Sequence, residues 1–179
     1  PTHTPEPGAG TRGRAVLFHD TFMEGNNPEV GIAATRVLER LGYGVMLVPR
    51  RCCGRPMLSQ GMLEQAREHA RRNVDLLYPL AREGVPIVGC EPSCLLILRD
   101  EYLSLLPGND RARVVADRTL LFDELVAGLA DEGEDLRAVF APHDGRVLFH
   151  PHCHQRALIG TAASEAALRV LTRNGCDVV

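Results

Sequence analysis

The sequence predicts an α/β fold, a parallel sheet with flanking helices. Three observations support this prediction. Short apolar runs alternate with segments of helical periodicity along the chain, which is the order expected of a parallel sheet. The notable cysteines fall just after an apolar run and at or before a helical segment. The length of 179 residues suits a domain of ordinary size with a real core.

The first elements have clear boundaries. The apolar run at 15–19 predicts a buried strand, and the run at 45–48 predicts a second one. Between them, Asn27 fits the N-cap of a helix and Pro28 fits its first position, and Gly42 ends it. This helix is expected over residues 28–41, because its apolar residues repeat at helical spacing.

The rest of the chain continues the alternation. Ser59 is expected to cap a long helix that runs to about Leu80, and Ser93 to cap a helix that begins at Cys94. The remaining expected elements are a strand at 85–89, a helix at about 117–130, a strand at 146–150 and a helix after His154.

Charge and hydropathy exclude some classes of function. The net charge is −3 and the pI is about 6.2, which argues against nucleic acid as a partner, since that needs a basic face. No apolar run approaches the roughly 18 residues of a membrane helix, so no transmembrane segment is expected. Residues 1–13 have no apolar core, and we expect a flexible linker or tail there rather than a signal peptide.

The cysteines point to metal or redox chemistry. Cys52 and Cys53 are adjacent in the stretch "VPRRCCGRPML", and adjacent cysteines rarely form a disulfide with each other. Six cysteines are too few for a disulfide scaffold in a chain of this length. The doublet alone leaves four interpretations open: each cysteine forms a disulfide elsewhere, both bind one metal, the two are a redox couple, or the doublet arose by chance.

The strand assignment brings a set of donor residues to one sheet edge. Loops after parallel strands meet at the carboxyl edge, where ligands bind in open sheets. Thiolates at such an edge suit iron–sulfur clusters or zinc; the alternative is buried cysteines without metal. Nearby arginines would offset the negative charge of the thiolates. The candidate metal ligands at this edge are Asp20, Cys52, Cys53, Cys90 and Cys94.

A second candidate group is the motif "HPHCHQR". Cys153 is expected to be a metal ligand in this motif. The neighbouring His150, His152 and His154 fit hydrogen-bonding roles around a metal better than direct ligation.

Cys176 is expected in the core at the start of a strand. The arginines of residues 67–72 and the carboxylates of Asp100 and Glu101 are expected on solvated helix surfaces. The sequence contains no motif for a phosphate-binding loop, a nucleophile elbow or paired catalytic carboxylates.

The sequence also repeats itself in part. "VLFH" occurs at 16–19 and at 147–150, and "AATRVLERLG" at 33–42 returns as "AALRVLTRNG" at 166–175 with seven of ten residues identical. The offset changes from 131 at the strand to 133 at the helix, and the helix offset of 133 aligns Cys153 with Asp20. A second doublet would be expected near position 185, so the second copy is predicted to be truncated.

These residues resemble the cysteine-rich CCG domain family. The resemblance covers about residues 14–179 and rests on "NPEVGIAATRVLERLGYGV", "CCGRPMLSQGMLEQAR", "EPSCLLILRDEY" and "HCHQRALIGTA". The family includes the cysteine-rich subunit of heterodisulfide reductase and the iron–sulfur subunit of glycolate oxidase. Within it, the chain is most similar to the C-terminal iron–sulfur part of bacterial FAD-linked D-2-hydroxy-acid oxidases. On this resemblance, residues 14–145 are a first CCG repeat and residues 146–179 begin an incomplete second one.

The resemblance also shows two departures. Asp20 stands where the family has its first cysteine, and Cys90 and Cys94 are spaced CxxxC where the family has CxxC. Some family members hold zinc in one site, so the first site here is expected to bind a [4Fe-4S] cluster or zinc. The second site, with Cys153, lacks its doublet within these residues.

The function that the resemblance implies is electron transfer. A cluster held by this chain would accept electrons from FAD on a separate domain or subunit of a 2-hydroxy-acid oxidoreductase, and pass them to a quinone or carrier. No residue of this chain is expected to act on the substrate. The expected location is the cytoplasm, or the inner face of the membrane as a peripheral protein. The alternatives are a structural zinc-binding or interaction domain and a thiol–disulfide enzyme using Cys52 and Cys53.

Overall fold

A computed structural model describes residues 3–49, 51–136, 139–141, 143–172 and 176–178, the last three as backbone only. The chain forms two compact units, residues 1–120 (unit 1) and residues 121–179 (unit 2).

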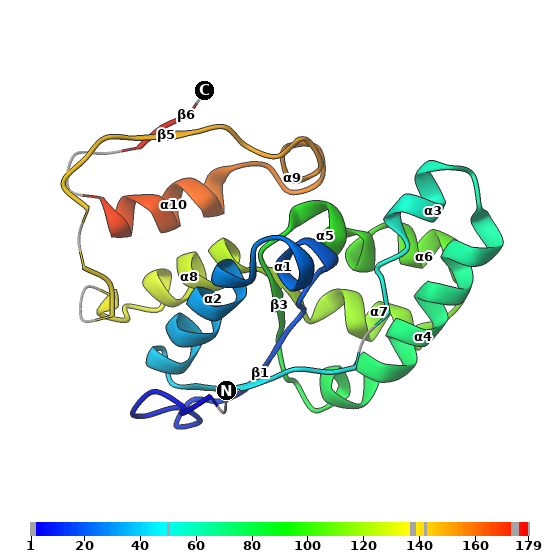
Figure 1. The fold of residues 1–179 in the computed structure, drawn as a ribbon, viewed down its shortest axis with the longest axis horizontal. Coiled ribbons are helices and arrows are strands. Elements are labelled where there is room, and N and C mark those ends of the chain that lie inside the picture. Colours follow the sequence, from blue (N-terminus) through cyan, green and yellow to red (C-terminus); the bar gives the residue numbers. More distant parts are fainter. Residues whose placement is uncertain (1–2, 50, 137–138, 142, 173–175, 179) are drawn as a thin grey trace. The chain divides into compact units, whose positions relative to one another are not determined.

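Unit 1 is built on a four-stranded parallel sheet, which confirms the predicted fold class (Figure 1). β1 and β2 lie within two residues of their predicted positions, and β3 covers the end of its predicted run. β4 was not predicted, because its three residues lie inside the segment assigned to a helix at 117–130. The strands are β1 (Gly13–Leu17), β2 (Tyr43–Met46), β3 (Ile87–Gly89) and β4 (Thr119–Leu121).

The order of strands in the sheet is β2-β1-β3-β4. β2 therefore lies on one side of β1 and β3 on the other, with Val16 of β1 opposite both Met46 and Ile87. From β1 the chain first adds β2 on one side and then crosses to add β3 and β4 on the other side, so the direction in which strands are added reverses between β1 and β3. In open parallel sheets the crevice at such a reversal, at the carboxyl ends of the strands, is where ligands bind. The loops that follow β1 and β3 flank this crevice.

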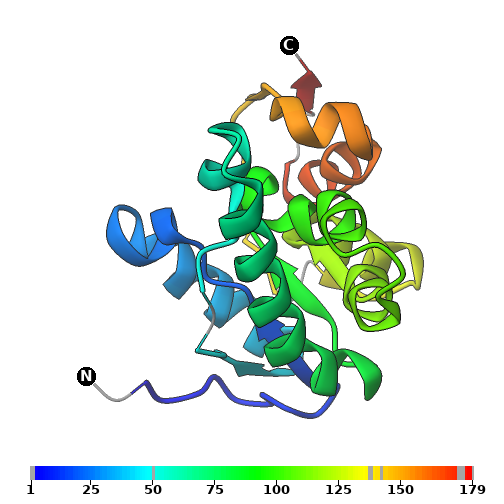
Figure 2. The ribbon, with the colours of Figure 1, turned by 90° about the vertical axis from the view of Figure 1, so that its right-hand side faces the viewer.

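Helices cover both sides of the sheet. Figures 1 and 2 show α2 on one side of the strands and α4 on the other. The helices of unit 1 are α1 (Thr21–Gly25), α2 (Pro28–Arg40), α3 (Arg55–Ser59), α4 (Leu63–Arg82), α5 (Pro92–Arg99), α6 (Glu101–Leu105) and α7 (Asp110–Asp117).

The predicted boundaries of α2 are nearly correct. Pro28 occupies the first turn, and Gly42 follows the helix with a φ of 90°. A residue with a Cβ would be strained there. Asn27 is at the N-cap, as predicted, but its side chain makes no capping hydrogen bond.

Two other predicted caps are wrong. Ser59 ends the short helix α3, and the long helix α4 begins only after Met62. Ser93 lies inside α5, whose N-cap is Glu91; the Glu91 carboxylate accepts a hydrogen bond from the Ser93 backbone N–H. Serine is a common N-cap, but α4 begins after Met62 without a capping side chain, and at α5 the Glu91 side chain takes the capping role.

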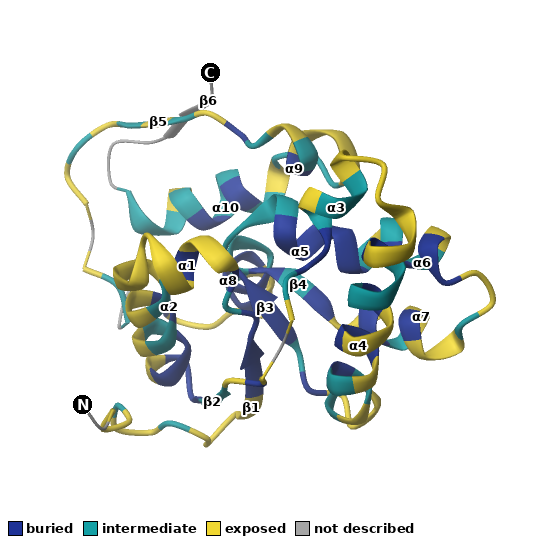
Figure 3. Cartoon of the chain, turned by 45° about the vertical axis from the view of Figure 1, so that its right-hand side comes forward, coloured by how far each residue is buried: buried dark blue, intermediate teal, exposed yellow. Residues whose placement is uncertain are grey.

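The core of unit 1 lies around β1, β3 and α5. Figure 3 shows these elements buried, while much of α2 is exposed. Four consecutive leucine and isoleucine residues of α5, from Leu95 to Leu98, are fully buried. A helix that is apolar all round is expected where the surrounding elements enclose it.

Unit 2 holds the strand predicted at 146–150. This strand, β5 (Val147–Phe149), pairs in parallel with β6 (Cys176–Val178) in a separate two-stranded sheet. The segment expected as a single helix after His154 forms two helices. The helices of unit 2 are α8 (Phe122–Asp131), α9 (Cys153–Leu158) and α10 (Ala162–Leu171).

The internal repeat is not confirmed. The order strand, short helix, helix, strand is the same in β1-α1-α2-β2 and β5-α9-α10-β6, and both strand pairs are parallel. The pairing register differs. By the sequence offsets, Val147 and Cys176 correspond to Val16 and Tyr43, and Val147 pairs with Cys176, whereas Tyr43 pairs with Gly13. The repeat therefore stays a prediction.

Within the described part of the chain, no helix is both long and apolar enough to cross a membrane.

Candidate metal centre

The cysteine doublet lies in the loop between β2 and α3. Gly54, the third residue of the motif, has a φ of 89° and is the N-cap of α3. A Cβ at this position would lie 3.3 Å from the Cβ of His69 and 3.5 Å from the carbonyl oxygen of Ala66. Glycine is needed here both for the left-handed backbone and for the close approach of α4.

Three thiols are linked by hydrogen bonds. Cys53 interacts with Cys52 on one side and with Cys94, in the first turn of α5, on the other. Cys53 is 3% exposed and Cys94 is 7% exposed. Figure 3 shows α1, α3 and α5 at the same end of the sheet. The structure thus brings together the loops after β2 and β3, as the sequence predicted, while the role of these thiols as metal ligands stays a prediction.

The hydrogen bond between Cys53 and Cys94 shifts the pKa values of the two thiols in opposite directions. A hydrogen bond from Cys53 holds the pKa of Cys94 below its ordinary value, against the opposing effects of burial and of the nearby Asp20 and Glu91 carboxylates. Donating that hydrogen bond, together with burial and the negative charge on Cys94, raises the pKa of Cys53 well above its ordinary value. The backbone N–H of Arg55 opposes this rise. Cys94 is therefore the thiol most readily ionised of the two.

Asp20 follows β1 and caps α1. One carboxylate oxygen, Oδ1, accepts hydrogen bonds from the backbone N–H groups of Phe22 and Met23, at 2.8 and 3.0 Å. The side chain is buried, and its charge raises the pKa of Cys94. The structure thus places this candidate ligand near the thiols and gives it a capping role that the sequence reading missed.

Cys90 directly follows β3 and is half-buried. It reaches the same sheet edge as Cys94, four residues further on. Among the residues whose side chains the structure describes, five cysteines are present and none forms a disulfide: Cys52, Cys53, Cys90, Cys94 and Cys153.

The donor set suits a soft metal, but the side chains are not gathered around one point. Among the described residues, no group of three or more His, Cys, Asp or Glu side chains is placed to hold a metal ion. The hydrogen bonds link Cys52 to Cys53 and Cys53 to Cys94. Asp20 and Glu91 are the carboxylates close enough to these thiols to affect the pKa of Cys94.

Two buried residues that the sequence reading missed hold the doublet. Asn73 of α4 donates from Nδ2 to the carbonyl oxygen of Cys52 at 3.1 Å, and the Tyr102 hydroxyl of α6 donates to the carbonyl oxygen of Cys53 at 2.8 Å. Burial raises the pKa of Tyr102 above its ordinary value, so the hydroxyl keeps its proton. His69 Nδ1 also lies 3.1 Å from the Cys52 carbonyl oxygen. A polar residue on a helix gives no sign in the sequence that it faces inward.

Glu101 is not the surface residue that the sequence reading expected. It forms an ion pair with Arg55, and both side chains are largely buried. Arg55 also donates from Nε to the carbonyl oxygen of Ser93 at 3.2 Å, which ties α3 to the helix that carries Cys94. The arginines of α4 are partly as expected: Arg71 and Arg72 are exposed, but Arg67 donates to the carbonyl oxygen of Leu105.

In unit 2, Cys153 is the exposed first residue of α9. The N-cap is His152, whose Nδ1 accepts from the backbone N–H of His154 at 3.2 Å, and the two imidazole rings stack at 5.6 Å. Gln155, also missed from the sequence, is buried and donates to Asp123 of α8 at 3.0 Å. The Cys176 side chain lies outside the described residues.

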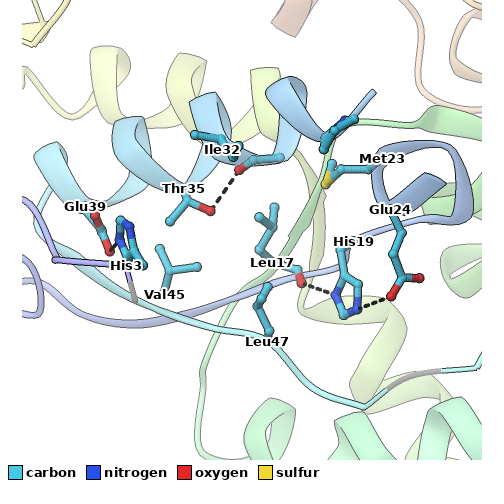
Figure 4. A pocket seen from close by; sticks show the side chains of 12 residues that line it. His3, Leu17, His19, Met23, Glu24, Ile32, Thr35, Glu39, Val45 and Leu47 are labelled. Atoms are coloured by element: carbon cyan, nitrogen blue, oxygen red, sulfur yellow. Dashed lines mark hydrogen bonds and ion pairs between the residues drawn. The ribbon is translucent and has the colours of Figure 1, made fainter. Parts of the chain in front are cut away.

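Unit 1 also has a half-open, mostly apolar cavity of about 460 Å³ between β1, β2 and α2 (Figure 4). His19 lies at one end, with Nδ1 3.5 Å from the Leu17 carbonyl oxygen and Nε2 4.0 Å from Glu24. His3 lies at the other end and bonds to the buried Glu39 at 2.7 Å. None of the three hydrogen-bonded thiols lines this cavity.

Comparison with known proteins agrees with the cysteine pattern. Residues 16–99 match the family model of a cysteine-rich domain named CCG. That range contains the doublet, Cys90, Cys94 and Asp20. No solved structure matches the chain.

Three curated relatives illustrate the similarity. One subunit of the anaerobic glycerol-3-phosphate dehydrogenase of Escherichia coli is 28% identical over 87% of this chain and 39% of its own length. D-2-hydroxyglutarate dehydrogenase of Pseudomonas putida is 37% identical over 92% of this chain and 15% of its own length. Lactate utilization protein A of a Geobacillus species is 25% identical over 88% of this chain and 64% of its own length. The chain thus spans less than two thirds of each of these relatives.

Proposed function

Because residues 16–99 form a cysteine-rich domain of the CCG family, we propose that this chain is the iron–sulfur electron-transfer module of a flavin-dependent 2-hydroxy-acid dehydrogenase. The observation that carries the proposal is the hydrogen-bonded group of Cys52, Cys53 and Cys94 at the carboxyl edge of the sheet. Thiolates are the usual ligands of iron–sulfur clusters.

Cys52, Cys53 and Cys94 are the thiols that would hold the cluster. The bound [4Fe-4S] cluster would supply a one-electron carrier. Cys90 and Asp20 are the further candidate ligands of this site, and Cys153 is a candidate ligand of a second site. A metal ligand must be deprotonated, and the lowered pKa of Cys94 favours this.

The polypeptide around the thiols would stabilise negative charge. The backbone N–H of Arg55 donates to Cys53, and Cys53 donates to Cys94. Hydrogen bonds and charge around the sulfurs are among the features that set a cluster's reduction potential. Burial of Cys53 and Cys94 would limit access of water to this part of the site.

The substrate chemistry would take place elsewhere. FAD on a separate domain or subunit would oxidise a 2-hydroxy acid of the D-lactate, glycolate or D-2-hydroxyglutarate type, and this chain would pass the electrons to a quinone or a carrier. Two of the relatives support this class of substrate, since they are named for D-2-hydroxyglutarate and lactate, which are 2-hydroxy acids. The third is named for glycerol 3-phosphate, a secondary alcohol outside that class. Free thiols suit a reducing compartment, which supports a location in the cytoplasm or at the inner face of the membrane.

A structural zinc site is the second candidate. Three thiols and one carboxylate are also suitable zinc donors. Asp20 occupies the position of the family's first cysteine, so this site has one thiol fewer to offer a cluster. A structural zinc would stabilise the fold without carrying electrons.

The test is metal analysis of the full-length protein purified without oxygen. The expected result is a brown protein that contains iron and acid-labile sulfide, both reduced by the content of one cluster on Cys53→Ser, with circular dichroism unchanged. Cys176→Ser is the matched control, since it makes the same substitution outside the three-thiol group, and it should keep the iron. Colourless protein containing zinc that is lost on Cys53→Ser would favour the second candidate. Metal content unchanged by Cys53→Ser would contradict both.

A further inference from the structure

Both peptide carbonyl groups of the cysteine doublet are held by side chains from distant helices. Asn73, from α4, donates to the Cys52 carbonyl oxygen at 3.1 Å, and Tyr102, from α6, donates to the Cys53 carbonyl oxygen at 2.8 Å. The residue before the doublet is held as well, because the backbone N–H of Arg51 donates to Asn73 Oδ1 at 3.0 Å. Each of the three consecutive residues from Arg51 to Cys53 thus has a backbone group with a fixed partner.

The hydrogen bonds form a connected network with one consistent set of directions. Asn73 Nδ2 also donates to the Tyr102 hydroxyl oxygen at 2.9 Å. The tyrosine hydroxyl has a single proton, and it is used in the bond to Cys53. Asn73 therefore uses both of its donors and its acceptor. Both side chains are 0% exposed, so water cannot replace a lost partner.

This network can explain how two adjacent residues serve as ligands of one metal. Side chains of neighbouring residues in extended backbone point to opposite sides. Two adjacent cysteines can serve one site only if the backbone between them is bent and held. Here the carbonyl groups point toward α4 and α6 and accept hydrogen bonds there, while the thiol of Cys53 reaches both Cys52 and Cys94.

We propose that Asn73 and Tyr102 are positioning residues of the metal site: they hold the doublet backbone so that Cys52 and Cys53 present both thiols to the same metal. This inference rests on the proposed function, because it requires a metal at these thiols. The two residues would act through the peptide groups and would not touch the metal.

Tyr102→Phe isolates this role. It keeps the buried ring and removes only the hydroxyl, leaving the Cys53 carbonyl oxygen and one Asn73 donor without a partner. Outer residues that orient metal ligands typically contribute about 10- to 100-fold to metal affinity. We therefore expect Tyr102→Phe to weaken metal binding about tenfold or more. The matched control is Tyr78→Phe on α4, because the Tyr78 ring faces Arg82 and Arg111.

The measurement is a titration of the reduced, metal-free full-length protein with Co²⁺ in the absence of oxygen. Co²⁺–thiolate charge-transfer absorption reports both affinity and the number of thiolates bound. The expected result is weaker binding and a lower charge-transfer intensity for Tyr102→Phe, and wild-type behaviour for Tyr78→Phe. A role in folding alone would lower the free energy of unfolding and leave the Co²⁺ spectrum of the folded protein unchanged.

The outcomes separate the inference from the proposed function. If Cys53→Ser weakens Co²⁺ binding and a folded Tyr102→Phe does not, the inference is wrong and the proposed site stands. If Cys53→Ser binds Co²⁺ as the wild type does, the proposed site itself is wrong. If Tyr102→Phe does not fold, Asn73→Ala decides, since it removes the hydrogen bond to the Cys52 carbonyl oxygen. Several-fold weaker binding would support the inference, and unchanged binding would overturn it.

Discussion

Gly54 shows how one residue of the doublet motif is determined by its surroundings. Its φ of 89° is in the left-handed region, and α4 passes close to it, with the His69 Cβ 3.3 Å from the position of a Cβ. Gly61 has a similar φ of 74° but has nothing within 4 Å. The two glycines therefore share the same backbone requirement and differ in packing.

We expect Gly54→Ala to lower the free energy of unfolding more than Gly61→Ala. Left-handed backbone costs an L-residue about 1–2 kcal/mol, and Gly61→Ala should lose about that amount. Gly54→Ala should lose more, because His69 must also move. Urea denaturation of the metal-free protein measures both. Equal losses would mean that the approach of α4 contributes nothing.

Among the elements, α2 and α7 both begin after an asparagine, but only one side chain acts as a cap. Asn109 Oδ1 accepts a hydrogen bond from the backbone N–H of Ala112 at 3.2 Å, at the start of α7. Asn27 occupies the same position before α2 without such a bond. Pro28, which has no N–H, already removes one of the unpaired donors there.

Asn109→Ala should therefore destabilise the protein by about 1 kcal/mol, the usual value of a capping side chain. Asn27→Ala is the matched control, and its effect should be near zero because no capping bond is lost. The shift in the thermal unfolding midpoint measures both. A larger loss for Asn27→Ala than for Asn109→Ala would contradict this account of the two helix starts.

At the scale of the whole molecule, the predicted repeat can be tested by an experimental structure of the full-length protein. Superposing β1 and α2 on β5 and α10 should place Asp20 over Cys153, since the helix offset of 133 aligns them. The expected result is the same strand register in both copies once the metal sites are filled. A difference of three residues in register, as found here between β1–β2 and β5–β6, would show that the two segments are similar in sequence but do not form equivalent structures.

Local sequence patterns determined much of this fold. Pro28 and Gly42 mark the ends of α2 because their effects on the backbone act within the residue itself. The alternation of apolar runs and helices determined the parallel sheet, and the position of Cys52, Cys53 and Cys94 after strands determined that these thiols meet at one edge.

Only the tertiary structure decided which residues surround the thiols. Glu101 lies on a short helix with no marked pattern, so the sequence predicts it in solvent, whereas the structure pairs it with Arg55. Asn73 and Tyr102 are separated from the doublet by about 20 and 50 positions in the sequence. The physical reason is that a strand, a turn or a glycine is governed by neighbours along the chain, whereas the partner of a buried polar side chain is set by how distant elements pack.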